Sequence, residues 1–311
     1  MAAIVINGNA IAAAVRREWK GRAEALKRRG VLPALAVIIV GDNLASKIYV
    51  RNKVKACCEV GLHSEVHELP TDIGEDMVLA YIRRLNHNPD IHGILVQLPL
   101  PPQLDRDKVL ATVSADKDVD GFHVHNLGAL VTGNALFPPC TPYGIQCLLD
   151  HMQIPIEGQN AVVVGRSTIV GKPMALMLLQ KGATVTVCTS KTRDLATYTR
   201  LADILVVATG KPNLITAAMV KEGAAVIDVG INRAPDGRLV GDVDFDGVQE
   251  KAGYLTPVPG GVGPMTVAML IANTVRAAER LAGEACRLTQ GEDVAGLPPR
   301  AASCTEYYHG L

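Results

Sequence analysis

The sequence predicts an α/β protein of two domains, the second a Rossmann-like, doubly wound parallel sheet, with a catalytic cleft between them. Short apolar segments alternate with longer segments of helical period, which is typical of βαβ units. The chain has 311 residues, of which 48% are hydrophobic. This is enough for two cores, since a domain commonly has about 150 residues. An irregular stretch with several prolines, residues 98–142, separates two groups of strand-like segments.

The predicted elements follow from length and period. Short apolar segments predict strands over residues 36–40, 94–97, 161–164, 184–188, 204–208, 225–229 and 254–257. Longer periodic segments predict helices over residues 11–29, 45–60, 75–86, 143–152, 173–180 and 266–282.

These elements divide the chain near residue 143. We expect residues 1–142 to form a first domain and residues 143–265 a second. The helix over residues 266–283 is expected to pack back on the first domain. Residues 284–311 lose the helical period and collect Gly, Pro and Ser, so we expect a partly disordered tail in preference to a subunit contact.

Composition narrows the classes of function. Lys plus Arg and Asp plus Glu are equal at 31 each, so no net charge favours nucleic acid or an anionic membrane. The cysteines are 7 in number, scattered and without C-x-x-C spacing, which argues against disulfides or zinc and fits a reducing cytoplasm. His123 and His125 have no supporting ligands nearby, so we expect no metal site. No apolar stretch is long enough for a membrane span, and the first residues do not resemble a targeting peptide.

A turn between the strand at 161–164 and the following helix suggests a site for a pyrophosphate. Backbone N–H groups at a helix N-terminus favour phosphate there. Of the glycines in a G-x-G-x-x-G fingerprint only Gly165 is present, since Ser167 and Val170 occupy the other two positions. The motif alone is therefore also compatible with a plain strand-to-helix turn.

The end of the next predicted strand indicates which nucleotide is bound. NAD-binding units place an acidic residue there to hold the ribose 2′-hydroxyl. This chain has Thr189, Ser190, Lys191 and Thr192 instead. Hydroxyls and a cation suit a 2′-phosphate, and Arg166 in the first turn adds a planar guanidinium group with several N–H donors. The sequence therefore predicts NADP rather than NAD.

Two further strand ends run into loops at the rim where ligands bind in such sheets, residues 226–232 and 256–264. Gly260, Gly261 and Gly263 let the backbone approach a flat ring closely. Taken alone, the second segment is equally compatible with a simple tight turn.

The first domain carries the candidate reactive groups. Tyr49 and Lys53 are four residues apart and share one helix face. Such a pair is usually just solvent-exposed, but Gln97 ends an apolar strand and Asp120 lies in a polar cluster over residues 116–123. Lys53 beside an amide suits proton transfer, and Asp120 suits the amino-pyrimidine edge of a bicyclic substrate.

These motifs together resemble the bifunctional methylenetetrahydrofolate dehydrogenase/methenyltetrahydrofolate cyclohydrolase family. The similarity covers residues 1–283, in order and at the family's spacing. It is carried by Tyr49-x-x-x-Lys53 and by residues 93–101, 118–123, 139–142, 165–167, 170–174 and 257–266.

The resemblance implies NADP-dependent oxidation of 5,10-methylenetetrahydrofolate to 5,10-methenyltetrahydrofolate, and hydrolysis of the latter to 10-formyltetrahydrofolate. Lys53 would be the central catalytic base, Gln97 would tune it, Tyr49 would stack on the folate, and Asp120 would hold the pterin. It further implies a folate cleft bordered by Leu98, Gly261 and Pro264, and an NADP site lined by Gly165, Arg166, Ser167, Ser190 and Ile231. A homodimer joined through the cofactor domain and a place in tetrahydrofolate interconversion and purine biosynthesis follow from the same resemblance.

The chain departs from the common pattern of that family at a few positions. Asn7-Gly8-Asn9 stands where many relatives have Asp-Gly-Lys, and Val124, Thr168 and Thr189 replace a usual Pro, Asn and His. These departures bear on the affinity for NADP and for the folate tail, since Tyr49, Lys53, Gln97 and Asp120 are all present.

Other functions remain open at this point. A short-chain dehydrogenase has a Tyr-x-x-x-Lys pair, but there the glycine motif precedes the pair, whereas here Gly165 follows it. A monofunctional NADP-dependent dehydrogenase of the same fold, or a non-catalytic folate- or nucleotide-binding protein, is a further alternative. Against the latter, Lys53 together with Gln97 and Asp120 exceeds what binding alone requires.

Overall fold

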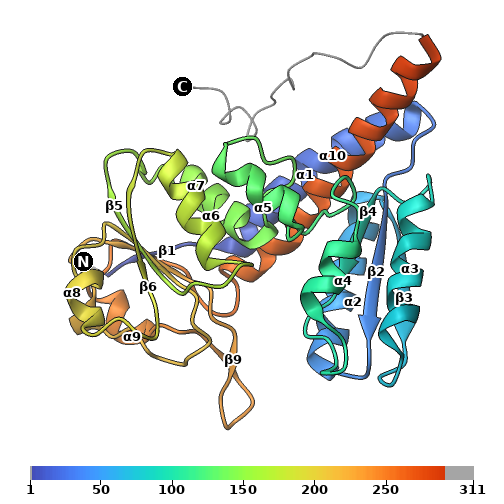
Figure 1. Ribbon diagram of the computed structural model, residues 1–311. Coiled ribbons are helices and arrows are strands. Elements are labelled where there is room, and N and C mark those ends of the chain that lie inside the picture. Colours follow the sequence, from blue (N-terminus) through green and yellow to red (C-terminus); the bar gives the residue numbers. More distant parts are fainter. Residues whose placement is uncertain (1, 291–311) are drawn as a thin grey trace. The chain divides into compact units, whose positions relative to one another are not determined.

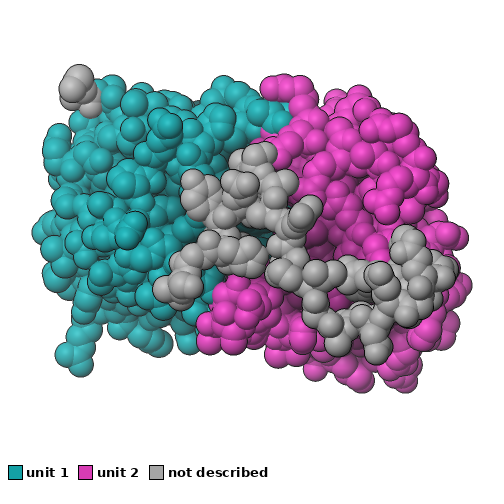
Figure 2. All heavy atoms as spheres, turned by 90° about the horizontal axis from the view of Figure 1, so that it is seen from above, with its two compact units in different colours: residues 1–14, 138–269 teal, residues 15–137, 270–311 magenta. Residues whose placement is uncertain are grey.

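The computed structural model describes residues 2–290, with side chains described up to residue 283. The chain forms two compact units (Figure 2). Of the described residues, unit 1 comprises 2–14 and Pro138–Met269, and unit 2 comprises Val15–Phe137 and 270–290. The division therefore falls inside two helices, α1 (Gly8–Arg28) and α10 (Val262–Gln290).

Unit 1 is built on a parallel sheet of the order β1-β11-β8-β7-β5-β6. Its strands are β1 (Ile4–Val5), β5 (Asn160–Val164), β6 (Thr184–Cys188), β7 (Ile204–Val207), β8 (Ala225–Asp228) and β11 (Tyr254–Leu255). In Figure 1, α6 (Cys140–His151) and α7 (Gly171–Gln180) lie on one face, and α8 (Leu195–Thr199) and α9 (Phe245–Gln249) on the other. A short 3-10 helix, η1 (Ala217–Met219), and an antiparallel pair, β9 (Asn232–Arg233) and β10 (Leu239–Val240), complete the unit. The expected Rossmann-like parallel sheet is confirmed.

Residues 1–14 belong to unit 1, whereas the sequence placed them with the first domain. β1 pairs in parallel with β11, with Ile4 opposite Tyr254. The Asn9 N–H donates to Gly260 O at 3.2 Å, and a Cβ on Gly8 would overlap the carbonyl of Gly261. Because β1 has only two residues and both are exposed, its sequence carries no strand signal.

Unit 2 contains a smaller parallel sheet of the order β3-β2-β4. Its elements are β2 (Ala34–Val40), α2 (Leu44–Val60), β3 (His63–Leu69), α3 (Glu75–His87), β4 (Gly93–Val96), α4 (Arg106–Thr112) and α5 (Val124–Val131). Every residue of β2 and of β4 is buried, which explains why both read as continuous apolar runs.

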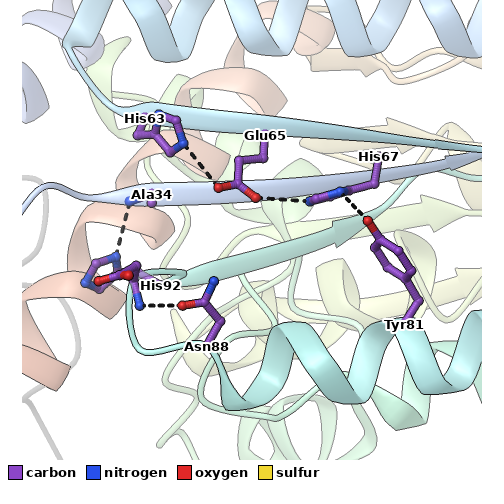
Figure 3. Close-up of polar contacts among 8 residues, drawn as sticks. Ala34, His63, Glu65, His67, Tyr81, Asn88 and His92 are labelled. Carbon is purple, nitrogen blue, oxygen red and sulfur yellow. Dashed lines mark hydrogen bonds and ion pairs between the residues drawn. The ribbon is translucent and has the colours of Figure 1, made fainter.

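Strand β3 was not predicted because most of its residues are polar. It lies at the edge of the sheet, where one side of the backbone has no neighbouring strand, and its side chains form a polar network (Figure 3). Glu65 accepts from His63 Nε2 at 3.3 Å, its other carboxylate oxygen lies 3.3 Å from His67 Nε2, and the Tyr81 hydroxyl of α3 lies 2.7 Å from His67 Nδ1. Burial lowers the pKa of His67, which favours the neutral ring. Charged and polar edge strands resist pairing with other chains.

The C-terminal helix is longer than expected. α10 begins at Val262, and its described part continues to Gln290, so residues 284–290 are helical. The rest of the predicted tail, residues 291–311, lies outside the described residues. Within unit 2, α10 contacts α1 and the segment before α5, through Glu279 to Arg22 and Asn273 to Val119.

None of the helices among residues 2–290 is both long and apolar enough to cross a membrane.

Candidate active site

Both sheets have a point where the strand order reverses. In unit 2 the chain passes from β2 to β3 on one side and later adds β4 on the other. In unit 1 it passes from β5 to β6 on one side and then to β7 on the other. Ligands of open α/β sheets bind at the carboxyl ends of the strands at such a point. Gln97 follows β4 directly, and Gly165 follows β5 directly.

The reversal point of unit 2 carries a lysine–amide pair. Lys53 Nζ donates to Gln97 Oε1 at 3.1 Å, and Gln97 Nε2 donates to Leu98 O at 2.7 Å. The Gln97 backbone N–H donates to Ile38 O of β2 at 2.8 Å. Because Leu98 fixes the NH₂ side of the amide, the carbonyl side is presented to Lys53. Lys53 and Gln97 are both half-buried.

Helix α2 positions Lys53 and Tyr49. Its N-cap is Asn43, whose side chain accepts from Ser46 N at 3.0 Å, so the helix starts at the carboxyl end of β2. Tyr49 lies one turn before Lys53 on the same face and is 37% exposed, so its ring is available to a ligand.

The loop that carries Asp120 is held by a neighbouring carboxylate. Asp118 is 5% exposed and accepts from Phe122 N at 3.2 Å, His123 N at 2.7 Å and Asn126 Nδ2 at 2.9 Å. It also forms an isolated parallel bridge with Ile94 of β4. Desolvation raises the pKa of Asp118 to about 6. The sequence did not reveal this role, because the alternation Asp118-Val119-Asp120 does not show which carboxylate points inward.

The reversal point of unit 1 is shaped by two glycines. Gly165 has φ of 135°, which disfavours other residues, and a Cβ there would overlap the carbonyl of Ala208 after β7. A Cβ on Gly171 would overlap the carbonyl of Gly165. Ser167 Oγ accepts from Val170 N at 3.2 Å and from Gly171 N at 3.3 Å, which caps the start of α7. The tight glycine turn expected from the sequence is present.

The remaining predicted cofactor residues lie on the same side of the sheet. Ser190 follows β6, Ile231 follows β8, and both are exposed, as is Arg166. Thr189 and Thr192 close the turn around Ser190, with Thr189 N donating to Thr192 Oγ1 at 2.9 Å.

The predicted folate-lining residues are distributed over both units. Tyr49, Lys53, Gln97, Leu98 and Asp120 belong to unit 2. Gly261 and Pro264 belong to unit 1 and flank the start of α10, where a Cβ on Gly261 would lie 2.6 Å from Pro257 O. Among these side chains, Lys53 contacts Gln97 directly.

Comparison with known proteins matches both halves of the chain. A model of the tetrahydrofolate dehydrogenase/cyclohydrolase catalytic domain matches residues 6–120, and a model of the NAD(P)-binding domain of the same family matches residues 139–282. The chain belongs to the tetrahydrofolate dehydrogenase/cyclohydrolase family. Its family models are those of an enzyme, and they exclude the short-chain dehydrogenase alternative.

Individual members of the family are similar over nearly their full length. The bifunctional protein FolD of Nitrosospira multiformis is 64% identical over 90% of this chain and 97% of its own. The FolD crystal structure from Campylobacter jejuni has a TM-score of 0.88 at 51% identity, covering 90% of this chain and 99% of its own. The Trypanosoma brucei FolD structure, described as complexed with NADP cofactor and inhibitor, has a TM-score of 0.87 at 40% identity, covering 90% and 98%.

The residues of this family member fit NADP. The turn at Gly165 leaves room for close backbone approach, and Arg166 and Ser190 are exposed donors. The end of β6 carries hydroxyls and Lys191 where a carboxylate would repel a 2′-phosphate.

Proposed function

We propose that this chain oxidises 5,10-methylenetetrahydrofolate with NADP and hydrolyses the resulting 5,10-methenyltetrahydrofolate to 10-formyltetrahydrofolate. The observation that carries the proposal is the Lys53–Gln97 hydrogen bond at the strand-order reversal of the catalytic domain. A binding protein has no need of an ammonium group held by an amide in that position.

In the hydrolytic reaction Lys53 accepts a proton from water and then donates it to the leaving nitrogen. In its amine form, Lys53 accepts a proton from the water whose oxygen bonds to the methenyl carbon. The bond from that carbon to N5 then breaks as the hydroxyl of the adduct loses its proton to solvent and becomes the formyl C=O, and the proton held by Lys53 passes to N5. Gln97 accepts from Nζ and so directs the remaining lone pair of the amine.

In the oxidation, bound NADP in its oxidised form would accept a hydride from the methylene carbon. Gly165, Arg166, Ser167, Ser190 and Ile231 would hold it, with Arg166 and Ser190 on the 2′-phosphate. The chain contributes orientation and the exclusion of water.

The substrate is proposed to contact the residues predicted to line the folate site. Tyr49 would stack on it and Asp120 would accept from the pterin's amino-pyrimidine edge. Leu98, Gly261 and Pro264 would line the remainder. The domain ranges proposed for these roles are residues 1–142 for folate and 143–265 for NADP, with the helix at 266–283 returning to the first.

The cellular setting is part of the proposal. Scattered cysteines without a disulfide framework fit a cytoplasmic enzyme. By similarity to its family, the chain would act as a homodimer joined through the cofactor domain. Its product, 10-formyltetrahydrofolate, would serve purine biosynthesis.

A spectrophotometric assay of the purified chain tests the function. Methylenetetrahydrofolate is supplied with NADP⁺ and separately with NAD⁺, and methenyltetrahydrofolate is then supplied alone. We expect oxidation preferring NADP⁺ and hydrolysis above the uncatalysed rate. Oxidation without hydrolysis would indicate the monofunctional dehydrogenase, and neither reaction would indicate a binding protein.

A further inference from the structure

Asp242 is a buried carboxylate of unit 1, near the residues proposed to bind the cofactor. Its exposed fraction is 0%, although aspartate is rarely fully buried unless it has partners. It follows β10, on a segment that no nucleotide-binding motif of the sequence includes. A charge in this position requires a dense set of donors.

The Asp242 carboxylate has those donors, and they come from two loops. Oδ2 accepts from Thr209 N at 2.6 Å, from Thr209 Oγ1 at 2.9 Å and from Gly210 N at 2.9 Å. Oδ1 accepts from Asn232 Nδ2 at 2.8 Å. One side chain therefore ties together the loop after β7 and the loop after β8.

Both loops border the predicted NADP residues. Ala208, immediately before Thr209, is the residue whose carbonyl a Cβ on Gly165 would overlap. Asn232 is adjacent to Ile231, which is exposed at the rim. A shift of either loop would change the surface on which the cofactor rests.

Asp242 is itself fixed by a second buried carboxylate. Asp228 ends β8 and is 3% exposed. It accepts from Gly230 N, Asp242 N and Val243 N, each at 2.9 Å. Burial raises the pKa of Asp228 to about 6. A Cβ on Gly230 would overlap the Asp242 carboxylate, so the backbone here is shaped to admit that group.

We propose that Asp242 is a positioning residue for NADP, which sets the loops after β7 and β8 at the spacing the cofactor requires. The inference rests on the proposed function, since it concerns the same cofactor. Asp242 does not touch the cofactor but acts through Thr209, Gly210 and Asn232.

The test uses Asp242→Asn in the full chain, with NADP affinity measured by calorimetry. The amide keeps the shape of the side chain, but an NH₂ group must now face donors on one side. We expect NADP affinity to fall about tenfold or more, by analogy with other losses of buried charged hydrogen bonds. In the cofactor-free protein, we expect the backbone amides of Thr209 and Gly210 to exchange about tenfold faster.

Hydrolysis of methenyltetrahydrofolate is the internal control, because it uses no NADP and its proposed proton-transfer pair, Lys53 and Gln97, lies in unit 2. We expect it to stay within about twofold of wild type. The matched variant is Asp244→Asn, two residues away, which weakens the cap of α9 at Gly247 N without touching either loop. It should leave NADP affinity unchanged. Thr209→Ala removes one donor and should weaken NADP by a smaller factor, even if Asp242→Asn does not fold.

Unchanged NADP affinity in folded Asp242→Asn and Thr209→Ala proteins would overturn the inference. An equal loss with Asp244→Asn would do the same, because it would mark a general effect on stability. If the wild-type protein bound no NADP, the proposed function itself would fail, so the two failures are distinguishable.

Discussion

The two units place different chemistry at the same point of the same kind of sheet. At the strand-order reversal of unit 2, two long side chains, Lys53 and Gln97, are held against each other. At the reversal of unit 1, the surface is made by the backbone of Gly165 and the start of α7, with short hydroxyls around it. The first arrangement suits proton transfer, and the second suits a phosphate-bearing ligand.

The carboxyl ends of the two sheets nevertheless share one feature. In each, a buried aspartate accepts several N–H groups of an adjoining loop: Asp118 in unit 2 and Asp242 in unit 1. In both units the parallel sheet therefore supplies the position, a buried carboxylate supplies the loop geometry, and the groups beside that loop decide the chemistry.

The largest effect is expected from Lys53→Met. Removing the amine removes the proposed proton carrier, so hydrolysis of methenyltetrahydrofolate should fall by about 10²–10⁴-fold. NADP affinity should not change, because the cofactor residues belong to unit 1. Initial rates and calorimetry check both statements. The control is Lys55→Met on the exposed side of α2, which should retain wild-type rates. Full hydrolysis by Lys53→Met would contradict the assignment of proton transfer to unit 2.

A smaller effect is expected from Ser190→Asp at the end of β6. A carboxylate there repels a 2′-phosphate but accepts from a ribose hydroxyl. NADP affinity should fall by about 10–100-fold while NAD affinity changes little, as measured by KM for each nucleotide. Arg166→Ala should act in the same direction. Equal losses for both nucleotides would show that the 2′-phosphate is read elsewhere.

The smallest effect is a pH dependence that arises from Asp118. Its pKa is raised from an ordinary 3.8 to about 6, so it stabilises the fold fully below pH 4, and this contribution is lost as pH rises through 6. The stability advantage of wild type over Asp118→Asn should therefore shrink between pH 4 and 7, by up to about 2–3 kcal/mol in the free energy of unfolding. Urea denaturation at each pH measures it.

The control for that experiment is Asp116→Asn, an exposed residue paired with Arg280 at 3.0 Å. Its stability difference from wild type should not shrink over the same range. An Asp118→Asn difference that grows with pH would contradict the assignment of desolvation as the dominant influence on Asp118.

The sequence predicts the buried strands of this molecule better than its edge strands and loops. Buried strands such as β2 and β4 are apolar throughout, so their positions follow from the sequence to within a few residues. Lys53 and Gln97 were likewise predicted as partners and lie in contact. β3 and β1 were not found, because an edge strand of polar residues and a strand of two residues carry no apolar pattern.

The buried aspartates were also beyond sequence reasoning. Asp242 is 33 residues from Thr209 and 10 from Asn232, and only the folded chain brings these donors together. In sequence, Gly241-Asp242 resembles any polar turn. Gly230 indicates the buried carboxylate only in the folded structure, where a Cβ on this residue would overlap the Asp242 side chain.

We assign the hydrolytic chemistry to the carboxyl ends of the unit 2 strands and cofactor binding to those of the unit 1 strands. Hydrolysis of methenyltetrahydrofolate by Gly165→Ala, with folding verified by circular dichroism, measures whether the two are separate. Because φ of 135° and the Ala208 carbonyl both oppose a Cβ at residue 165, NADP binding should be lost. We expect hydrolysis at the wild-type rate in the same folded protein. Loss of hydrolysis in parallel with NADP binding would show that the two activities do not reside in separate units.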